Sequence, residues 1–234
     1  MIRARLLLIP IAFVATLVAG CAATVDSRAP AAPAPSYHVG DRWTYDAEDG
    51  FREKLRWVET HEVIAVTPQG ISVRITQAGD RVDNVRTELW PAPGLVSVGA
   101  LYDHETRRFT KPLQRYSFPL RPGDSWNQWV ENVNETALTG GIINRYVRVG
   151  DWESVSTPAG TFDAVQLRVI MRLDDDDFWR GPTVTGDRIW YAPSVRSFVR
   201  VQRDAEFIER DGIDSAPVRT QHGTLELRSF TPGA

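Results

Sequence analysis

Apolar and polar residues alternate along much of the chain. In the segment 165–173, VQLRVIMRL, every odd position is apolar, and Ile170 is the one apolar residue at an even position. The segment 71–76, ISVRIT, alternates in the same way. A period of two indicates a β-strand with one buried face. We therefore predict hairpins over residues 58–76 and 147–173.

Further strands are predicted where similar patterns lie between turn signals, and the pair Gly140-Gly141 is interpreted as a turn. No segment after residue 36 has the period of a helix. The predicted fold is all-β and antiparallel, either a strongly curved sheet or a barrel built from two similar halves. Two separate small sandwiches are the alternative. The further strands cover residues 42–48, 53–66, 82–90, 95–101, 106–110, 125–134, 185–192, 196–206 and 219–230.

Three short motifs occur in the same order in each half, about 37–112 and 113–230. They are Gly-Asp-x-Trp from residues 40 and 123, Thr-Pro-x-Gly from 67 and 157, and Trp-x-Ala-Pro from 90 and 190. Thr-Pro-x-Gly favours a turn, and the proline after Trp-x-Ala ends a strand because it cannot donate to a central ladder. The sequence therefore predicts an internal repeat. Its structural landmarks are Trp43, Trp126, Pro68, Pro158, Trp90 and Trp190.

The N-terminus has the pattern of a secretory signal. Arg3 and Arg5 precede an uncharged apolar run over residues 6–18. This run is too short to span a bilayer, which needs roughly 20 apolar residues. The following Val-Ala-Gly-Cys, residues 18–21, resembles the lipobox of bacterial lipoproteins. An ordinary secretory signal that happens to contain a cysteine is the alternative.

The lipoprotein resemblance implies cleavage between Gly20 and Cys21 and acyl chains, such as palmitate, on Cys21. Two chains give stable membrane anchoring. Ala22, rather than aspartate, follows the cysteine. By analogy with Gram-negative lipoproteins, this implies sorting to the inner leaflet of the outer membrane, facing the periplasm.

The expected domains are a signal peptide at 1–20, a lipidated Cys21 with an Ala/Pro tether at 21–36, and a β-domain at 37–230. Extended at about 3.1 Å per residue, the tether would hold the domain up to about 45 Å from the membrane. The single cysteine excludes a disulfide framework and a thiolate metal cluster. The net charge of −3 gives no basis for a nucleic-acid partner.

The segments GTFDAVQLRV (160–169) and IWYAPSVRSFVRVQR (189–203) resemble a group of uncharacterised bacterial envelope proteins. These are secreted or lipid-anchored β-proteins that carry a Gly-x-Phe-x-Ala hairpin and a Trp-Tyr-x-Pro strand. The resemblance implies an envelope location and a β-fold, and it carries over no catalytic residue. The chain departs from the pattern at residues 194–196, where it has Ser-Val-Arg in place of Gly-Val-Gly. The sequence therefore leaves open whether a sharp turn follows Pro193.

Few motifs in the chain suggest chemistry. The segment HEVIA (61–65) lacks the second histidine of a zinc-protease helix, and we expect no metal and no cofactor. The acidic run DDDDFW is interpreted as a solvated tip, with a bound cation as the alternative. Its aromatic pair is a candidate contact for a partner or a membrane, or else packs back onto the sheet. The candidate tip consists of Asp174, Asp175, Asp176, Asp177, Phe178 and Trp179.

Three functions remain open. The favoured hypothesis is a non-enzymatic binding or assembly role for a lipid, a peptide or a partner protein, since the sequence contains no paired catalytic set. The alternatives are an envelope hydrolase that uses carboxylates such as Asp151, Glu153 or Asp163, and a purely structural scaffold. A binder should contain a contiguous apolar cavity, and an enzyme should contain converging carboxylates in a cleft.

Overall fold

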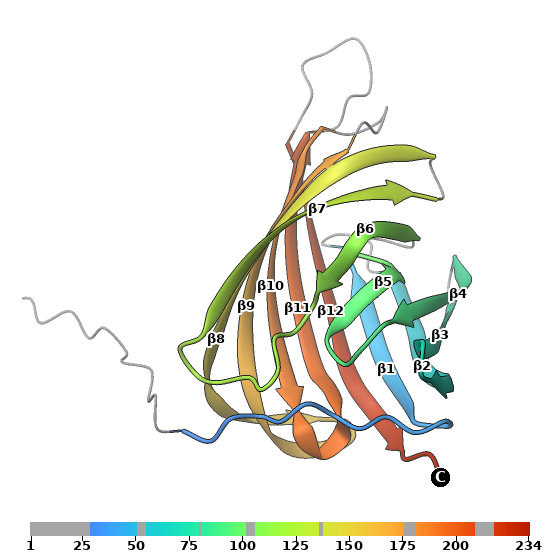
Figure 1. The fold of residues 1–234 in the computed structure, drawn as a ribbon, viewed down its shortest axis with the longest axis vertical. Coiled ribbons are helices and arrows are strands. Elements are labelled where there is room, and N and C mark those ends of the chain that lie inside the picture. Colours follow the sequence, from blue (N-terminus) through green and yellow to red (C-terminus); the bar gives the residue numbers. More distant parts are fainter. Residues whose placement is uncertain are drawn as a thin grey trace, which may run out of the picture.

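The twelve strands of the described residues form one closed antiparallel barrel, shown in Figure 1. The computed structural model describes residues 29–50, 55–79, 81–101, 106–135, 138–175, 181–208 and 218–234. Each strand pairs with the strand before it in sequence, and β12 pairs with β1 to close the barrel. The prediction of an all-β antiparallel fold is confirmed. The alternatives of an open sheet and of two sandwiches are wrong, because every strand belongs to the same closed ladder.

Most strands lie close to their predicted positions. An exception is β8, which begins at Thr139 and includes Gly140 and Gly141 opposite residues 133 and 132. The interpretation of this glycine pair as a turn is therefore wrong. The strands are β1 (Arg42–Asp49), β2 (Leu55–Thr67), β3 (Gly70–Gly79), β4 (Val82–Trp90), β5 (Leu95–Gly99), β6 (Arg107–Gln114), β7 (Ser125–Asn134), β8 (Thr139–Thr157), β9 (Gly160–Asp175), β10 (Thr183–Ala192), β11 (Ser197–Ile208) and β12 (Val218–Thr231).

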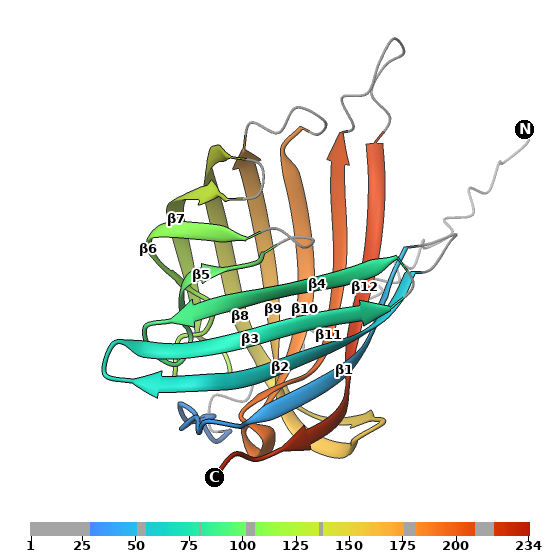
Figure 2. The same cartoon turned by 90° about the vertical axis from the view of Figure 1, so that its right-hand side faces the viewer.

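The barrel wall changes direction around its circumference. In Figure 2, β1 to β4 run across the view while β8 to β12 run upright behind them. Pairing is extensive within these two groups, but the described residues of β4 and β5 share only one pair, Leu89 with Val98. The ladder between β6 and β7 is also short and ends at the pair Phe109 and Asn132. The wall therefore has its fewest ladder contacts between β4 and β7.

The two Gly-Asp-x-Trp motifs form matching turns. Gly40 and Gly123 have φ values of 90° and 94°, a region that glycine adopts without steric cost. The Gly40 amide donates to the carbonyl oxygen of Val63 at 2.8 Å, and the Gly123 amide donates to that of Val149 at 3.0 Å. The local backbone of these landmarks is therefore alike, while a repeat of the whole half stays a prediction.

The two Thr-Pro-x-Gly motifs also form matching turns, between β2 and β3 and between β8 and β9. Pro68 and Pro158 each occupy the second position. The threonine hydroxyl accepts a hydrogen bond from the amide of the third residue, at 3.3 Å in the first turn and 3.2 Å in the second. Both turns close as the sequence predicted, because proline and a glycine with positive φ fit this geometry.

The turn after Pro193 is sharp although no glycine is present. A 3₁₀ turn, η1 (Pro193–Val195), ends at Arg196, which has the left-handed conformation with φ 60° and ψ 16°. The Arg196 amide donates to the carbonyl oxygen of Pro193 at 3.0 Å. The turn expected from the envelope-protein pattern is therefore present, with arginine in the conformation that its glycine would adopt more easily.

The N-terminal part of the described chain packs across one end of the barrel, at the bottom of Figure 1. Ala32 is fully buried and exchanges two backbone hydrogen bonds with Leu120, of 2.9 Å and 2.8 Å. The indole of Trp152 donates to the carbonyl oxygen of Pro30 at 2.8 Å. These contacts place residues 30–32, part of the segment predicted as a tether, against the barrel.

The same end is tied together by Asp41, whose side chain is fully buried. The carboxylate accepts hydrogen bonds from the amides of His38 and Gly233, both at 2.8 Å, and lies 3.1 Å from the guanidinium of Arg196. One carboxylate thus joins both ends of the described chain to the turn after β10. Trp43 lies beside it, buried, and donates to the carbonyl oxygen of Val195 at 2.6 Å.

We predict that Asp41→Ala lowers the free energy of unfolding by about 3 kcal/mol, because it leaves two amides and one guanidinium without their acceptor. The matched control is Asp124→Ala, since Asp124 occupies the same motif position but is exposed. Its loss should cost less than about 0.5 kcal/mol. Urea unfolding followed by tryptophan fluorescence measures both, and equal effects of the two substitutions would contradict the role assigned to Asp41.

Candidate functional site

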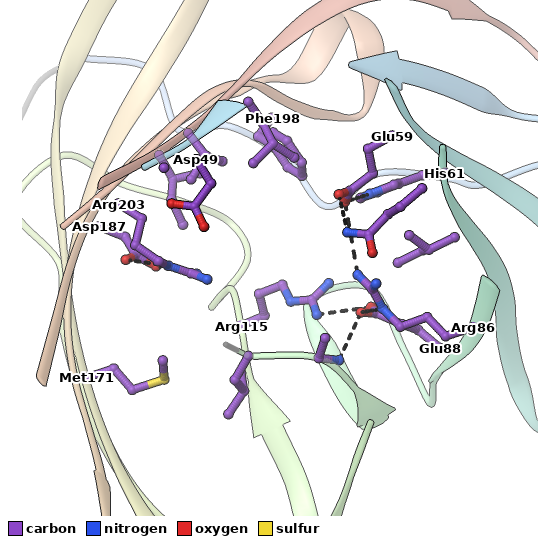
Figure 3. A pocket seen from close by; sticks show the side chains of 18 of the residues that line it. Asp49, Glu59, His61, Arg86, Glu88, Arg115, Met171, Asp187, Phe198 and Arg203 are labelled. Carbon is purple, nitrogen blue, oxygen red and sulfur yellow. Dashed lines mark hydrogen bonds and ion pairs between the residues drawn. The ribbon is translucent and has the colours of Figure 1, made fainter. Parts of the chain in front are cut away.

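The barrel contains a cavity of about 210 Å³ that is partly open to solvent. Its two sides differ in chemistry (Figure 3). The side formed by β2, β3 and β4 is polar, whereas much of the side formed by β9 to β12 is apolar. The polar side carries Glu59, His61, Gln77, Arg86 and Glu88, and the apolar side carries Met171, Ile189, Val201 and Leu225.

Strand alternation explains how charged residues reach the interior. Successive side chains of a strand point to opposite faces, so every second residue of a barrel strand faces inward. In β2 these positions include Glu59 and His61, and in β4 they include Arg86 and Glu88. The polar side of the cavity therefore arises where inward positions carry charge in place of an apolar residue.

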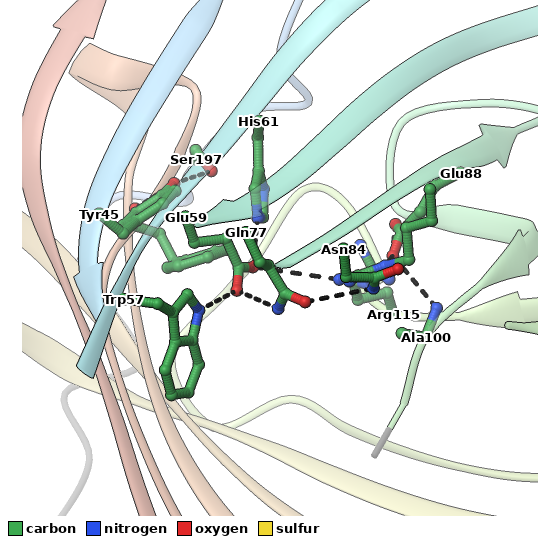
Figure 4. A network of polar contacts seen from close by, with 12 residues as sticks. Tyr45, Trp57, Glu59, His61, Gln77, Asn84, Glu88, Ala100, Arg115 and Ser197 are labelled. Carbon is green, nitrogen blue, oxygen red and sulfur yellow. Dashed lines mark hydrogen bonds and ion pairs between the residues drawn. The ribbon is translucent and has the colours of Figure 1, made fainter. Parts of the chain in front are cut away.

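Glu59 is the centre of one polar network (Figure 4). Its carboxylate accepts hydrogen bonds from the indole of Trp57 at 3.1 Å and from the Gln77 amide at 2.6 Å, and the His61 ring lies at 2.7 Å. Burial alone would raise the pKa of Glu59. The contacts with His61, the charge of Arg86 and the hydrogen bond from Gln77 outweigh burial and lower this pKa to about 2.

Glu88 is held in a similar way. Its carboxylate accepts hydrogen bonds from the indole of Trp90 at 2.8 Å, from Arg115 at 3.0 Å and from the Ala100 amide at 3.2 Å. Burial would raise the pKa of Glu88, but the charges of Arg115 and Arg86 and the Trp90 hydrogen bond lower it overall. Both carboxylates of this side are therefore ionised at neutral pH.

A third carboxylate lies across the cavity on β10. Asp187 accepts two hydrogen bonds from Arg203 on β11, at 2.9 Å and 2.8 Å. Such a two-bond arrangement fixes both the position and the plane of the guanidinium. Figure 3 shows this pair opposite Arg115 and Glu88, with Met171 nearby.

Two arginines of the cavity are less well neutralised. Arg145 is 4% exposed and donates to the backbone carbonyl oxygens of Gln114 and Arg115, at 2.9 Å and 3.0 Å, with no carboxylate of the described residues within 4.0 Å. Burial, together with the nearby charges of Arg115 and Arg203, lowers the pKa of Arg145 to about 10 despite the opposing effect of Asp187. Arg145 is therefore a buried cation at neutral pH.

Arg86 is the second such arginine. Its side chain is 9% exposed, and its nearest carboxylate oxygens, those of Glu88 and Glu59, lie at 3.9 Å and 4.0 Å. These distances are too long for hydrogen bonds. The Nε and Nη1 atoms are buried without a hydrogen-bond partner among the described residues.

The carboxylates proposed from the sequence for a hydrolase lie elsewhere. Asp151, Glu153 and Asp163 belong to the hairpin of β8 and β9 and do not line the cavity. Glu153 accepts hydrogen bonds from the Gln166 amide at 2.8 Å and from the indole of Trp190 at 2.7 Å. Glu153 thus holds a landmark tryptophan in place.

Part of the predicted acidic tip is described. Asp174 lies in β9 and accepts a hydrogen bond from the neighbouring Arg172 at 3.1 Å, and the backbone of Asp175 ends that strand. Residues 176–179 of the candidate tip lie outside the described residues, as do Gly20 and Cys21. Among the side chains that the structure does describe, no three His, Cys, Asp or Glu residues converge as a metal site.

Sequence reasoning missed the residues of this cavity. A signal was present, because Asp187 occurs in phase with the inward apolar residues Ile189 and Tyr191, and Arg145 in phase with Ile143 and Val147. Alternation alone, however, does not reveal which charged residues of different strands face one another. That depends on the register of strands far apart in sequence.

No family model matches the chain, and no curated protein matches its sequence. Two solved structures share its fold. A candidate lipoprotein from Parabacteroides distasonis is 13% identical and covers 87% of this chain and 100% of its own, with a TM-score of 0.51. A candidate exported protein with a YmcC-like fold from Bacteroides fragilis is 15% identical, and the match covers 86% of this chain and 100% of that protein, also with a TM-score of 0.51.

The expectation of a β-fold drawn from the envelope-protein resemblance is therefore confirmed. At these identities the likeness concerns the fold. No helix among the described residues has the length and apolar composition needed to cross a membrane.

We predict that stability decreases as the pH falls from about 4.5 to about 2. The pKa of Glu59 is about 2 in the folded chain and near 4.5 when unfolded, so protons bind preferentially to the unfolded state in this window. The loss from this carboxylate is about 3 kcal/mol at the acid end. Glu59→Gln should flatten the pH dependence of the urea-unfolding free energy by about that amount, and parallel curves for the two proteins would contradict the assignment.

Proposed function

We propose that this chain is a lipid-anchored envelope protein that binds a small molecule inside its barrel without transforming it. The observation that carries this proposal is the cavity of about 210 Å³ inside the barrel, which is partly open to solvent and has a charged side and a largely apolar side. Concave sites with apolar walls and a few fixed polar groups are typical of small-molecule binding. The positions of these polar groups are fixed by hydrogen bonds within the barrel wall.

The ionisation of the carboxylates argues against an acid–base hydrolase at this cavity. A general acid at neutral pH needs a raised pKa, and a general base works best with a pKa near the working pH. The pKa values of Glu59 and Glu88 are instead lowered. Glu59 and Glu88 each already accept hydrogen bonds from neighbouring residues of the barrel, so they are poorly placed to accept a proton from a substrate. Binding is the function that this arrangement supports.

The size of the cavity limits the ligand. A protein cavity of about 150 Å³ holds one benzene molecule. A cavity of about 210 Å³ therefore has room for roughly one substituted ring or a short chain. Because the cavity is partly open, this volume limits the part of a ligand that lies inside the barrel, and a complete diacyl lipid would not be contained in it.

The location proposed for this function follows from the N-terminal sequence. Acylation of Cys21 would anchor the chain, and Ala22 favours the inner leaflet of the outer membrane by the lipoprotein analogy. The two proteins of similar fold are described as a lipoprotein and an exported protein, which agrees with an envelope location. The end of the barrel covered by residues 30–38 would then face the anchor, because the chain enters the barrel there.

The proposal is tested by native mass spectrometry of the full chain, purified from membranes in a nonionic detergent. We expect a population with an added mass in the range of a small molecule, lost on denaturation. The acyl chains on Cys21 remain covalently bound after denaturation, so they are distinguished from the ligand. A chain that carries only its acyl groups, and that gains no mass when incubated with an envelope extract, would contradict the proposal.

A further inference from the structure

Four arginines and five carboxylates of the described residues line the cavity. Glu48 and Asp49 also line the wall, but they lie half-buried at the end of β1, and Glu48 is paired with Arg56 at 3.0 Å. Deeper in the barrel the cations are Arg86, Arg115, Arg145 and Arg203, and the buried carboxylates are Glu59, Glu88 and Asp187. Among the described residues the arginines therefore do not outnumber the carboxylates, and they differ instead in how closely a carboxylate approaches each of them.

Two of these four arginines have no carboxylate at hydrogen-bond distance among the described residues. Arg115 has a partner at 3.0 Å and Arg203 has one at 2.8 Å. Arg145 has no carboxylate within ion-pair distance among the described residues, and Arg86 has two buried nitrogens without a hydrogen-bond partner. A buried cation without a counter-ion costs several kcal/mol, and buried donors are normally satisfied. Both arginines line the same cavity.

We infer that the ligand of this cavity is a small anion with an apolar part, such as a short or aromatic carboxylate, whose charged group is bound by Arg86 and Arg145. The apolar part lies against the lining residues Ile189, Val201 and Leu225. This inference rests on the proposed binding function and adds the chemical class of the ligand.

The geometry also explains why these arginines are not simply salt bridges of the fold. The Nη1 atom of Arg145 is held by two backbone carbonyl oxygens, so its guanidinium is positioned without being neutralised. Preorganised donors of this kind reduce the cost of ordering side chains when a ligand binds. A cation kept for the stability of the barrel alone would instead be expected beside a carboxylate.

The test uses aromatic probes of nearly equal shape and different charge: benzoate, benzamide, benzamidinium and phenylphosphonate. Each is titrated into the full chain in nonionic detergent and followed by saturation-transfer NMR, with empty micelles as the blank. We expect benzoate to bind at least about tenfold more tightly than benzamide. Benzamidinium should not bind, and phenylphosphonate, as a second anion, should bind more tightly than benzamide.

Two variants test the assigned residues. Arg145→Gln and Arg86→Gln should each weaken benzoate binding by about tenfold or more and leave benzamide binding unchanged. The matched control is Arg108→Gln, because Arg108 is exposed and pairs with Glu135 outside the cavity. Since removal of an unneutralised buried charge relieves a cost, Arg145→Gln should have a thermal midpoint at or above that of the wild type.

The outcomes separate the two proposals. Equal affinity of the wild type for benzoate and benzamide would overturn the anion inference while leaving binding in the barrel in place. Binding of benzamidinium as tight as that of benzoate would overturn the anion inference as well. If no probe binds, the anion inference fails, and the native mass spectrum decides independently whether another ligand occupies the barrel. The probe comparison needs only the wild type, so it stands even if a variant fails to fold.

Discussion

Closing the sheet into a barrel forces alternate side chains of all twelve strands into one interior, and some of these side chains are ionised. That constraint governs the rest of the structure. An interior charge must be neutralised by another interior group, because water has little access to it. Glu59, Glu88 and Asp187 meet this requirement with donors from neighbouring strands. The strands of the barrel are therefore linked by side-chain contacts as well as by their ladders.

The closed end of the barrel follows the same principle. Asp41 is fully buried, and its charge is matched by two backbone amides and Arg196. This arrangement holds together the N-terminal segment, the C-terminal residues and the turn after β10. The left-handed backbone of Arg196, which costs free energy for a residue with a Cβ, is offset by the contacts that its side chain makes there. The ion pair between Asp41 and Arg196 therefore accounts both for the left-handed backbone of Arg196 and for the contacts that hold this end of the barrel together.

The sequence was informative about strands and turns but much less about the cavity. The alternation in 165–173 predicted β9, and the Thr-Pro-x-Gly motifs predicted both hairpin turns, because these features depend on nearby residues. The glycine pair at 140–141 was misinterpreted, since a glycine can end a strand or, as here, lie within one opposite β7. Arg115 and Glu88, by contrast, meet because the ladders from β4 to β5 and from β5 to β6 bring them together. Local patterns do not contain that information.

The matching turns lie in two parts of the chain that contribute different groups to the cavity. Strands β2 to β4 place Glu59, Arg86 and Glu88 inside, whereas β9 to β12 place mainly apolar residues there, beside the ion pair of Asp187 and Arg203. A turn depends on a few neighbouring residues, but the chemistry of the interior depends on which residue occupies each inward position of a strand. Similar turns therefore do not require similar interiors, and an inward charge is retained only where a neighbouring strand supplies its partner.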